Sequence, residues 1–313
     1  MIKHLLAALV ILLPLHASAE PDDNVMTVES LDAAIKAAAE QENYEEVRWL
    51  SEKGCLFEVP EFCYTYAFVL HNGWGGPEDL SKAEPAYTLA CENDIPDACN
   101  ALGTFAENGS VGEVDGAAAR SFYKKACRLG EPIGCYNLAY TWQEGIGGDV
   151  SRDSATELYR RACTNGMAEA CLNLSLLLDT DDPEARSAMN LACEADIPSA
   201  CYYHGEMLQN GEGGPVDLEK AYDRYALACS MDYADGCFLQ GVALTSGDGV
   251  QEDPVLARKL FHATCQSDHA HACALYAFML EDGSGGKKDL NGAHDAYVRA
   301  CDLGLENEIC SKL

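Results

Sequence analysis

Cys127-Arg-Leu-Gly-Glu-Pro-Ile-Gly-Cys135-Tyr-Asn-Leu-Ala-Tyr-Thr-Trp-Gln-Glu-Gly-Ile-Gly-Gly148 is a stretch in which two cysteines, eight residues apart, lead into an apolar segment and a glycine-rich loop. The pattern recurs, because the sixteen cysteines fall into eight pairs, seven spaced C-x7-C and the last spaced C-x8-C. Successive first cysteines lie 36 residues apart, except for one step of 30 residues from Cys163 to Cys193. A fixed period of this size predicts a solenoid of helical repeats, each packed on its neighbours.

Other residue types keep the same register as the cysteines. A glycine stands ten residues after the second cysteine in six units, where a left-handed residue can end a helix. An Asp or Ser stands twelve residues before each following pair, where its side chain can accept hydrogen bonds from the first N–H groups of a new helix. An alanine and a large side chain follow four and eight residues later on one helix face, so small packs against large between helices. These positions are Gly73, Gly109, Gly145, Gly211, Gly247 and Gly283; Asp79, Asp115, Ser151, Asp181, Asp217, Asp253 and Asp289; Ala83, Ala119, Ala155, Ala185, Ala221, Ala257 and Ala293; and Tyr87, Tyr123, Tyr159, Met189, Tyr225, Phe261 and Tyr297.

Each unit is therefore predicted to be a hairpin of two helices. Helix A begins at the second cysteine and ends near the glycine, and helix B runs from the Asp or Ser to the next first cysteine. Seven such hairpins between Cys63 and Cys301 give an all-α fold, a right-handed α/α solenoid. The 30-residue step has a local cause, because the glycine loop is missing there and Thr180-Asp181-Asp182-Pro183 makes a shorter turn.

The cysteine pairs are predicted to form disulfides. In one continuous helix, residues eight apart would lie about 12 Å from each other, beyond the roughly 7 Å that a disulfide allows between Cα atoms. Turn formers such as Asn93-Asp94-Ile95-Pro96 reverse the chain between the cysteines, so a bridge can join the end of helix B to the start of the next helix A. The rival interpretation, metal binding, lacks C-x-x-C spacing and enough histidines. The predicted pairs are Cys55–Cys63, Cys91–Cys99, Cys127–Cys135, Cys163–Cys171, Cys193–Cys201, Cys229–Cys237, Cys265–Cys273 and Cys301–Cys310.

The N-terminus has the features of a secretory signal peptide. Lys3 supplies a positive charge, residues 5–15 form an apolar run, and Ala17-Ser18-Ala19 matches a cleavage site. This run is shorter than the roughly 20 residues that span a bilayer, and no other stretch approaches that length. We expect residues 1–19 to be a signal peptide, 20–54 a helical cap in which Asn43 separates two helices, and 55–313 the solenoid with a short C-terminal cap. Export to the bacterial periplasm or the medium fits the cysteine content, because disulfides persist in oxidising compartments.

Composition limits the choice of partners. The chain carries 51 Asp and Glu against 21 Lys and Arg, a formal net charge of −30, so nucleic acid and anionic membranes would be repelled. The 48% of hydrophobic residues allow a substantial core. The sequence has no C-x-x-C redox motif and no C-x-x-C-H haem attachment motif, and we expect no cofactor.

The repeat resembles the Sel-1-like repeat in its cysteine-rich form, as in the Helicobacter cysteine-rich proteins. The stretch quoted above carries this resemblance, and so does Asp217-Leu-Glu-Lys-Ala-Tyr-Asp-Arg-Tyr-Ala-Leu-Ala-Cys229. It covers residues 55–310 and implies a tetratricopeptide-like solenoid with one disulfide per repeat. It also implies a protein-binding adaptor or scaffold, while the cysteine-rich branch carries a label of penicillin binding and weak β-lactamase activity. Fold alone does not decide between these activities.

Two serines have a lysine three residues later, as β-lactam acylation requires. They form the pairs Ser121/Lys124 and Ser284/Lys287, and chance alone predicts a match of this kind. Ser121 lies on a solvated face of a predicted helix B, Ser284 lies in a glycine loop, and the chain has no S-D-N or K-T-G partner motif. The favoured interpretation is that neither serine is catalytic.

The segment between Cys265 and Cys273 contains His269 and His271, residue types that bind metals. Because the other seven pairs have no such histidines, the favoured interpretation is a normal disulfide whose turn happens to contain two histidines. A metal or haem site, if present, is predicted here.

Helix A also offers a candidate binding groove. Positions two and five after the second cysteine point away from the predicted buried face, vary between units and should line the concave surface. Aromatic side chains there suit contact with a partner, and packing on the next repeat is the competing interpretation. By analogy with tetratricopeptide grooves, the asparagines could bind a peptide backbone. The groove residues are Phe68, Asn137, Tyr140, Asn173, Tyr203, Glu206, Leu239 and Phe278.

The sequence thus predicts an exported, monomeric, disulfide-linked scaffold that binds a protein or peptide with a basic patch. The alternative function is that of a weak β-lactamase, a penicillin-binding protein or a protein that binds peptidoglycan fragments. The chain is not expected to be an enzyme, and if it is one, β-lactam hydrolysis is the expected reaction.

Overall fold

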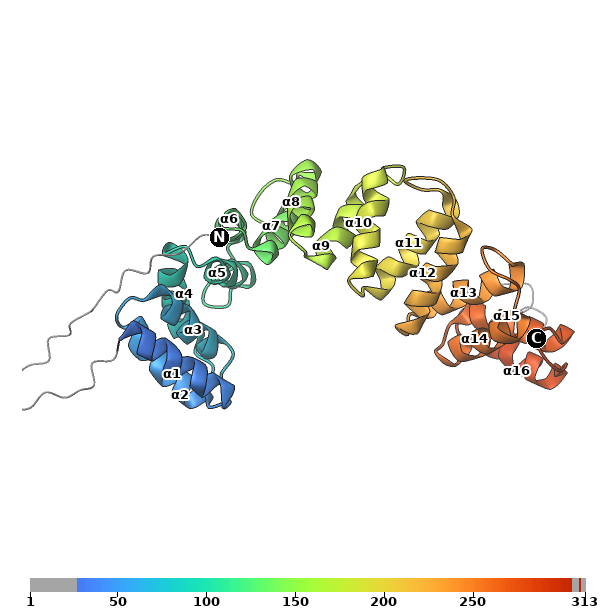
Figure 1. The fold of residues 1–313 in the computed structure, drawn as a ribbon, viewed down its shortest axis with the longest axis horizontal. Coiled ribbons are helices and arrows are strands. Elements are labelled where there is room, and N and C mark those ends of the chain that lie inside the picture. Colours follow the sequence, from blue (N-terminus) through green and yellow to red (C-terminus); the bar gives the residue numbers. More distant parts are fainter. Residues whose placement is uncertain (1–26, 306–309, 311–313) are drawn as a thin grey trace, which may run out of the picture. The chain divides into compact units, whose positions relative to one another are not determined.

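The computed structural model describes residues 27–305 and residue 310, and the predicted signal peptide lies outside them. Regular secondary structure in this part of the chain consists of sixteen α-helices (Figure 1). They are α1 (Val28–Glu40), α2 (Tyr44–Cys55), α3 (Pro60–His71), α4 (Leu80–Glu92), α5 (Pro96–Asn108), α6 (Gly116–Arg128), α7 (Pro132–Glu144), α8 (Arg152–Thr164), α9 (Ala168–Leu177), α10 (Pro183–Glu194), α11 (Pro198–Asn210), α12 (Leu218–Ser230), α13 (Ala234–Ser246), α14 (Pro254–Gln266), α15 (Ala270–Asp282) and α16 (Leu290–Asp302).

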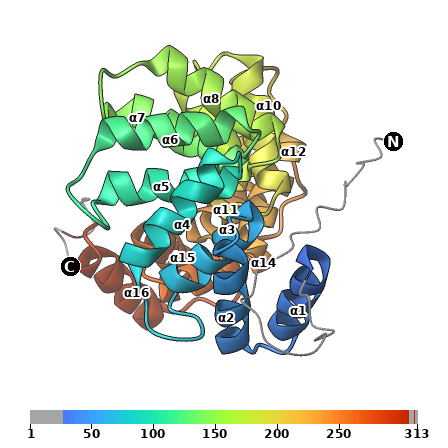
Figure 2. The same cartoon turned by 90° about the vertical axis from the view of Figure 1, so that its left-hand side faces the viewer.

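The helices form two compact units, residues 1–151 and residues 152–313. In unit 1, α1 and α2 are separated at Asn43, as predicted, and helices α4 to α7 succeed one another as packed layers (Figure 2). In unit 2, consecutive helices from α8 to α16 pack on one another. Both units are therefore built from repeats that contact their sequence neighbours, which is the architecture the period predicts. No helix in the described residues combines the length and the hydropathy needed to cross a membrane.

Two details of the helix boundaries differ from the prediction. Helix A begins about three residues before the second cysteine, for example at Pro96 for Cys99, because proline is well suited to the first helical position. The cap of α10 is Asp182 rather than Asp181, since its side chain accepts from the backbone N–H of Glu184. The other predicted Asp caps accept a hydrogen bond from the N–H three residues on, and these are Asp79, Asp115, Asp217, Asp253 and Asp289.

The core follows the predicted pairing of small and large residues. The alanine eight residues before each first cysteine is almost completely buried, and the ring or Met side chain four residues later is buried in six of the seven hairpins. A small residue four after the second cysteine faces that ring, and a Cβ at Gly205 would lie 2.5 Å from the ring of Tyr225. The buried tyrosine hydroxyls find partners on the preceding helix A, as in Tyr225 to Gln209 at 2.7 Å and Tyr123 to Glu107 at 2.6 Å.

A left-handed residue forms the turn between helix B and the next helix A. It stands three residues after every first cysteine and has φ between +59° and +101°. This turn brings the Cα atoms of the first seven cysteine pairs to 4.4–4.7 Å and those of the last pair to 5.6 Å, and all eight disulfides are formed between the predicted partners. The left-handed residues are Glu58, Asp94, Gly130, Gly166, Asp196, Asp232, Asp268 and Gly304.

Glu58 is the left-handed residue least suited to its turn, because it has neither the freedom of Gly nor the short polar side chain of Asp. We expect Glu58→Gly to raise the free energy of unfolding by about 0.5–1 kcal/mol, since the relief of backbone strain exceeds the entropy that glycine adds to the unfolded chain. Urea unfolding of the oxidised protein measures this. Glu61→Gly, at an exposed helical position of α3, is the matched control and should lower stability by a similar amount. Equal effects of the two variants would contradict the prediction.

Arginine links each of four glycine loops to the preceding helix. An arginine seven residues before the first cysteine donates to backbone carbonyls of the loop after the next helix A, and these residues are Arg48, Arg120, Arg186 and Arg258. The four loops share the pattern Gly-x-Gly-Gly, and a Cβ on the last glycine would lie 2.7–2.9 Å from the arginine Nη1. The other two glycine loops lack this pattern, and Glu84 and Tyr222 replace the arginine. The paired occurrence indicates that arginine and glycine are required together.

Arg186 makes the most extensive of these contacts, with its guanidinium donating to the carbonyls of Met207 at 2.8 Å, Pro215 at 2.9 Å, Glu212 and Gly214. Arg186→Ala should lower the free energy of unfolding by about 2 kcal/mol, because buried carbonyls lose a charged donor. Urea unfolding measures the loss. Lys220→Ala is the control, since the ion pair of Lys220 with Asp217 is exposed and should contribute less than about 1 kcal/mol. A loss for Arg186→Ala no larger than the control's would contradict the role of the arginine.

Candidate functional site

The predicted groove positions lie outside the core. No residue two or five after a second cysteine is buried in the described part of the chain. Tyr140, Tyr203 and Phe278 are 42%, 39% and 55% exposed, although each is a large apolar side chain. These three side chains are therefore accessible to a partner. Helix A differs from the prediction at another position, because the residue six after the second cysteine is buried in six of the seven hairpins.

In unit 1, two of the predicted groove residues are already engaged. Phe68 packs edge-on against Trp74 of its own loop, with ring centroids 5.3 Å apart. The amide of Asn137 donates to Asn100 Oδ1 at 2.9 Å and so links consecutive A helices. Both side chains serve the repeat itself, which is the competing interpretation given above for groove residues.

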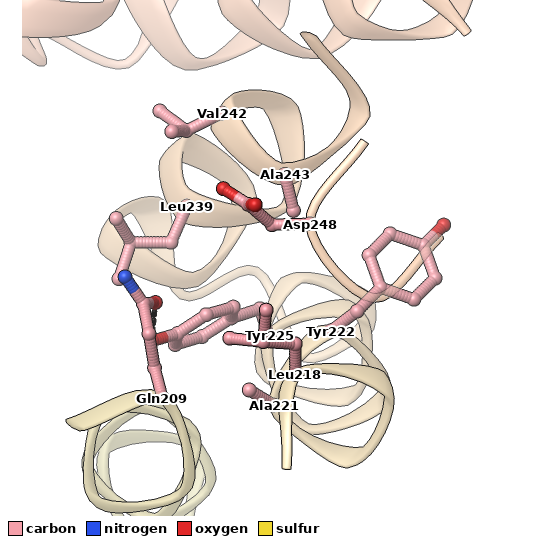
Figure 3. Close-up of a pocket in the computed structure, with 9 residues that line it drawn as sticks. All are labelled: Gln209, Leu218, Ala221, Tyr222, Tyr225, Leu239, Val242, Ala243 and Asp248. Atoms are coloured by element: carbon pink, nitrogen blue, oxygen red, sulfur yellow. Dashed lines mark hydrogen bonds between the residues drawn. The ribbon is translucent and has the colours of Figure 1, made fainter. Parts of the chain in front are cut away.

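Leu239 in unit 2 also faces its neighbours. It lines a small cavity of about 30 Å³, room for about one water molecule, between α11, α12 and α13. Figure 3 shows Leu239 beside Gln209 and Tyr225, whose hydrogen bond closes one side of this cavity. The cavity is too small for a ligand, and Leu239 acts as a packing residue. Asn173 of α9 is half-buried and has a polar partner.

The other groove residues of α11 belong to a larger group, which we call the tyrosine–carboxylate patch: Tyr202, Tyr203 and Glu206 of α11, with Tyr233 and Asp235 at the start of α13. The rings of Tyr202 and Tyr203 lie 5.0 Å apart edge-on, and those of Tyr202 and Tyr233 lie 5.5 Å apart. Tyr202 hydrogen-bonds Glu206. The patch therefore combines three aromatic rings with two carboxylates on neighbouring A helices.

The electrostatics of the patch are those of crowded acids. Burial raises the pKa of Glu206, and the charges of Glu212 and Asp235 raise it further, while the hydrogen bond from Tyr202 opposes them. Burial also raises the pKa of Tyr233, with a further contribution from Asp235. The carboxylates lack a basic neighbour strong enough to reverse this effect on Glu206, so a cationic group would be stabilised here.

His269 and His271 do not form a metal centre. His269 Nδ1 accepts from the backbone N–H of Ala272 at 3.1 Å, and Nε2 lies 3.1 Å from Asp235 Oδ1. The imidazole thus carries its proton on Nε2 and caps α15, with Phe238 stacked on it at 4.8 Å. Both cysteines nearby are in a disulfide, and the described residues contain no group of three His, Cys, Asp or Glu able to hold a metal ion.

The two serine–lysine pairs lack the geometry of an acylating serine. Ser121 and Lys124 are exposed on α6, and within the described residues neither side chain makes a hydrogen bond or ion pair. Ser284 donates its hydroxyl to Asp282 at 2.7 Å, and not to Lys287. Neither serine therefore has a lysine positioned to remove its proton.

The disulfides, the helix hairpins and the exposed A-helix residues define a class of protein: disulfide-linked helical repeat scaffolds. The model of the Sel1 repeat matches residues 60–85, 96–131, 132–167, 198–233, 234–269 and 270–305. The chain belongs to the Sel1-repeat family. The unmatched segment between residues 167 and 198 contains the hairpin without a glycine loop. Sel1-repeat scaffolds generally mediate protein interactions and are typically non-enzymatic.

Solved structures support the fold. A protective antigen of uropathogenic Escherichia coli with an SLR fold is 19% identical, with a TM-score of 0.66, over 88% of this chain and 70% of that one. A Sel1 repeat protein of Oxalobacter formigenes is 18% identical, with a TM-score of 0.56, over 79% and 98%. Cysteine-rich protein B of Helicobacter pylori is 28% identical over 46% and 96%, with a TM-score of 0.33. A search of curated proteins found no match.

Sequence reasoning found Tyr203 and Glu206 but missed Tyr202, Tyr233 and Asp235. Tyr202 follows the second cysteine directly, and three other hairpins also have an aromatic residue at that position, Tyr64, Tyr136 and Phe238. That recurrence could have identified Tyr202. Nothing in the repeat register indicates that Tyr233 and Asp235, which lie in a turn and in the next helix, approach α11.

His204, beside the patch on α11, is only 5% exposed, and its Nδ1 is buried without a partner. Burial, followed by the charges of Arg224, Arg186 and Lys220, lowers its pKa to about 4. The unfolded chain is protonated below about pH 6.5, so this histidine lowers the stability of the fold as the pH falls from 6.5 towards 4. Between pH 7 and 4.5, wild type should lose about 2 kcal/mol more than His204→Gln in urea unfolding. Parallel pH profiles would contradict the prediction.

Proposed function

We propose that this chain is an exported scaffold that binds a protein or peptide with basic side chains through the A-helix surface of unit 2, at the tyrosine–carboxylate patch. The single observation that supports it is the grouping of Tyr202, Tyr203 and Tyr233 around Glu206 and Asp235. The family supports a binding role in general, and the patch gives that role a chemistry.

Lysine and arginine fit this patch for two reasons. A cation over a tyrosine face gains about 0.5–2 kcal/mol, and it relieves the repulsion between the carboxylates, which is reflected in the raised pKa of Glu206. The net charge of −30 attracts a basic partner from a distance, in a manner that salt weakens.

Export and a monomeric state complete the proposal. Eight disulfides indicate an oxidising compartment, and the N-terminal sequence has the features of a signal peptide. No cofactor is part of the proposed function. β-Lactam hydrolysis is not proposed, because no observation at Ser121 or Ser284 favours it.

The proposal is tested by selecting random displayed peptides on the oxidised protein in 20 mM salt. Selected peptides should be enriched in Lys and Arg, and their affinity, measured by fluorescence polarisation, should fall at least tenfold in the double variant Tyr203→Ala/Glu206→Gln. Tenfold corresponds to the loss of one cation–aromatic contact and one charge. Affinity should also fall at 300 mM salt.

Leu191→Ala/Glu219→Gln is the matched control, because it removes one exposed apolar side chain and one acidic charge from helices α10 and α12, away from the patch. This variant should bind within twofold of wild type. Selected peptides without basic residues, or an equal loss in both double variants, would overturn the proposal.

A further inference from the structure

Helices α14 and α15 and the loop 283–289 enclose a cleft of about 520 Å³. Its walls are cationic, with Arg258, Lys259 and His262 from α14 and Lys287 and Lys288 from the loop, while Tyr276 of α15 completes one side. The His262 and Tyr276 rings lie 4.7 Å apart. Four permanent positive charges therefore line one recess of a chain whose formal net charge is −30.

These cations lack acidic partners. Within the described residues, no carboxylate lies within 4 Å of Arg258, Lys259, Lys287 or Lys288, whereas lysines elsewhere pair with acids, as Lys36 does with Asp32. Other lysines paired in this way are Lys82, Lys125 and Lys220.

The two nearby carboxylates serve the backbone instead. Asp289 caps α16 by accepting from the N–H of Gly292 at 2.9 Å, and Asp282 accepts from the N–H and hydroxyl of Ser284 at 2.7 Å. The lysine charges are thus left to face the cleft.

The repeat does not require this charge. Arg258 has a structural role shared by three other hairpins, because it binds the loop carbonyls of Ser284 and Lys287. The three lysines have no basic counterpart in the other hairpins with a glycine loop. Position by position, these have Trp49, Pro85, Ser121, Ser187 and Asp223 for Lys259; Pro77, Glu113, Asp149, Pro215 and Gln251 for Lys287; and Glu78, Val114, Val150, Val216 and Glu252 for Lys288.

The equivalent cleft between α4 and α5 makes the contrast direct. It has about 220 Å³ and places Glu84, Thr88 and Glu113 where the cationic cleft has Arg258, His262 and Lys287. The same architecture thus carries opposite charge in two hairpins, so the lysines are an addition to the scaffold.

We propose that the cationic cleft binds a compact anion with two or more negative charges on phosphate or carboxylate groups. Its size is that of a small-molecule site, and the lysines supply rotatable donors for oxyanions. The rest of the chain selects for a small ligand, because an extended polyanion would reach beyond the Debye length of about 8–10 Å into the acidic surface. The inference is independent of the peptide-binding proposal, since the two sites share no residue.

Isothermal titration calorimetry of the oxidised protein with inorganic pyrophosphate and with citrate, in 20 mM salt, tests this proposal. We expect saturable 1:1 binding of at least one of them, and the better ligand identifies the phosphate or the carboxylate source. Affinity should fall at least tenfold in Lys287→Gln/Lys288→Gln and severalfold in Lys259→Gln. Both loop lysines are exposed, and a circular dichroism spectrum confirms that each variant folds.

Lys36→Gln/Lys82→Gln is the control, because it makes the same change in net charge on helices of unit 1. It should bind within twofold of wild type. The proposal is overturned if neither anion binds saturably below 10 mM, a limit set at about tenfold above the weakest specific affinity of interest. It is also overturned if the two double variants lose affinity equally.

Discussion

The turn between each helix B and the following helix A sets the geometry on which every other contact depends. Its left-handed residue, three positions after the first cysteine, brings the two cysteines within disulfide distance and fixes where helix A starts. That start places the small residue four positions after the second cysteine against the ring of the next helix B, as in Gly205 against Tyr225. A glycine or aspartate in the turn and a small residue in the helix are thus requirements of a single packing arrangement.

The arginine contacts act at a longer range. The guanidinium of Arg186 binds carbonyls 21 to 29 residues ahead, so a glycine loop that would otherwise expose its backbone is held by the preceding repeat. Repeats that replace the arginine also lack the Gly-x-Gly-Gly pattern, which shows that the scaffold has two ways to close a loop. The surface residues between these fixed positions are free to differ from one repeat to the next.

Much of this structure is readable from the sequence, because a repeat repeats its evidence. The cysteine pairs, the Asp caps and the buried alanines appear in nearly every unit, so local spacing predicts them. Asp182 replaced Asp181 as a cap because the missing loop removes the register that predicted it. The approach of Asp235 to α11 depends on how consecutive hairpins pack, and no spacing within one repeat encodes that distance. Phe68 and Leu239 were predicted as groove residues, but their exposure depends on neighbours, namely Trp74 and Tyr225.

Function in such a scaffold resides where the repeats disagree. Glu206 and Asp235 give one pair of A helices an acidic, aromatic surface, while Lys259, Lys287 and Lys288 give one cleft a positive charge that its counterpart at Glu84 and Glu113 reverses. Neither group of side chains stabilises the hairpins, and each carries an electrostatic cost that a ligand of opposite charge would remove. Because the staples, caps and arginine contacts hold the backbone without them, these positions can differ in charge while the hairpin geometry stays the same.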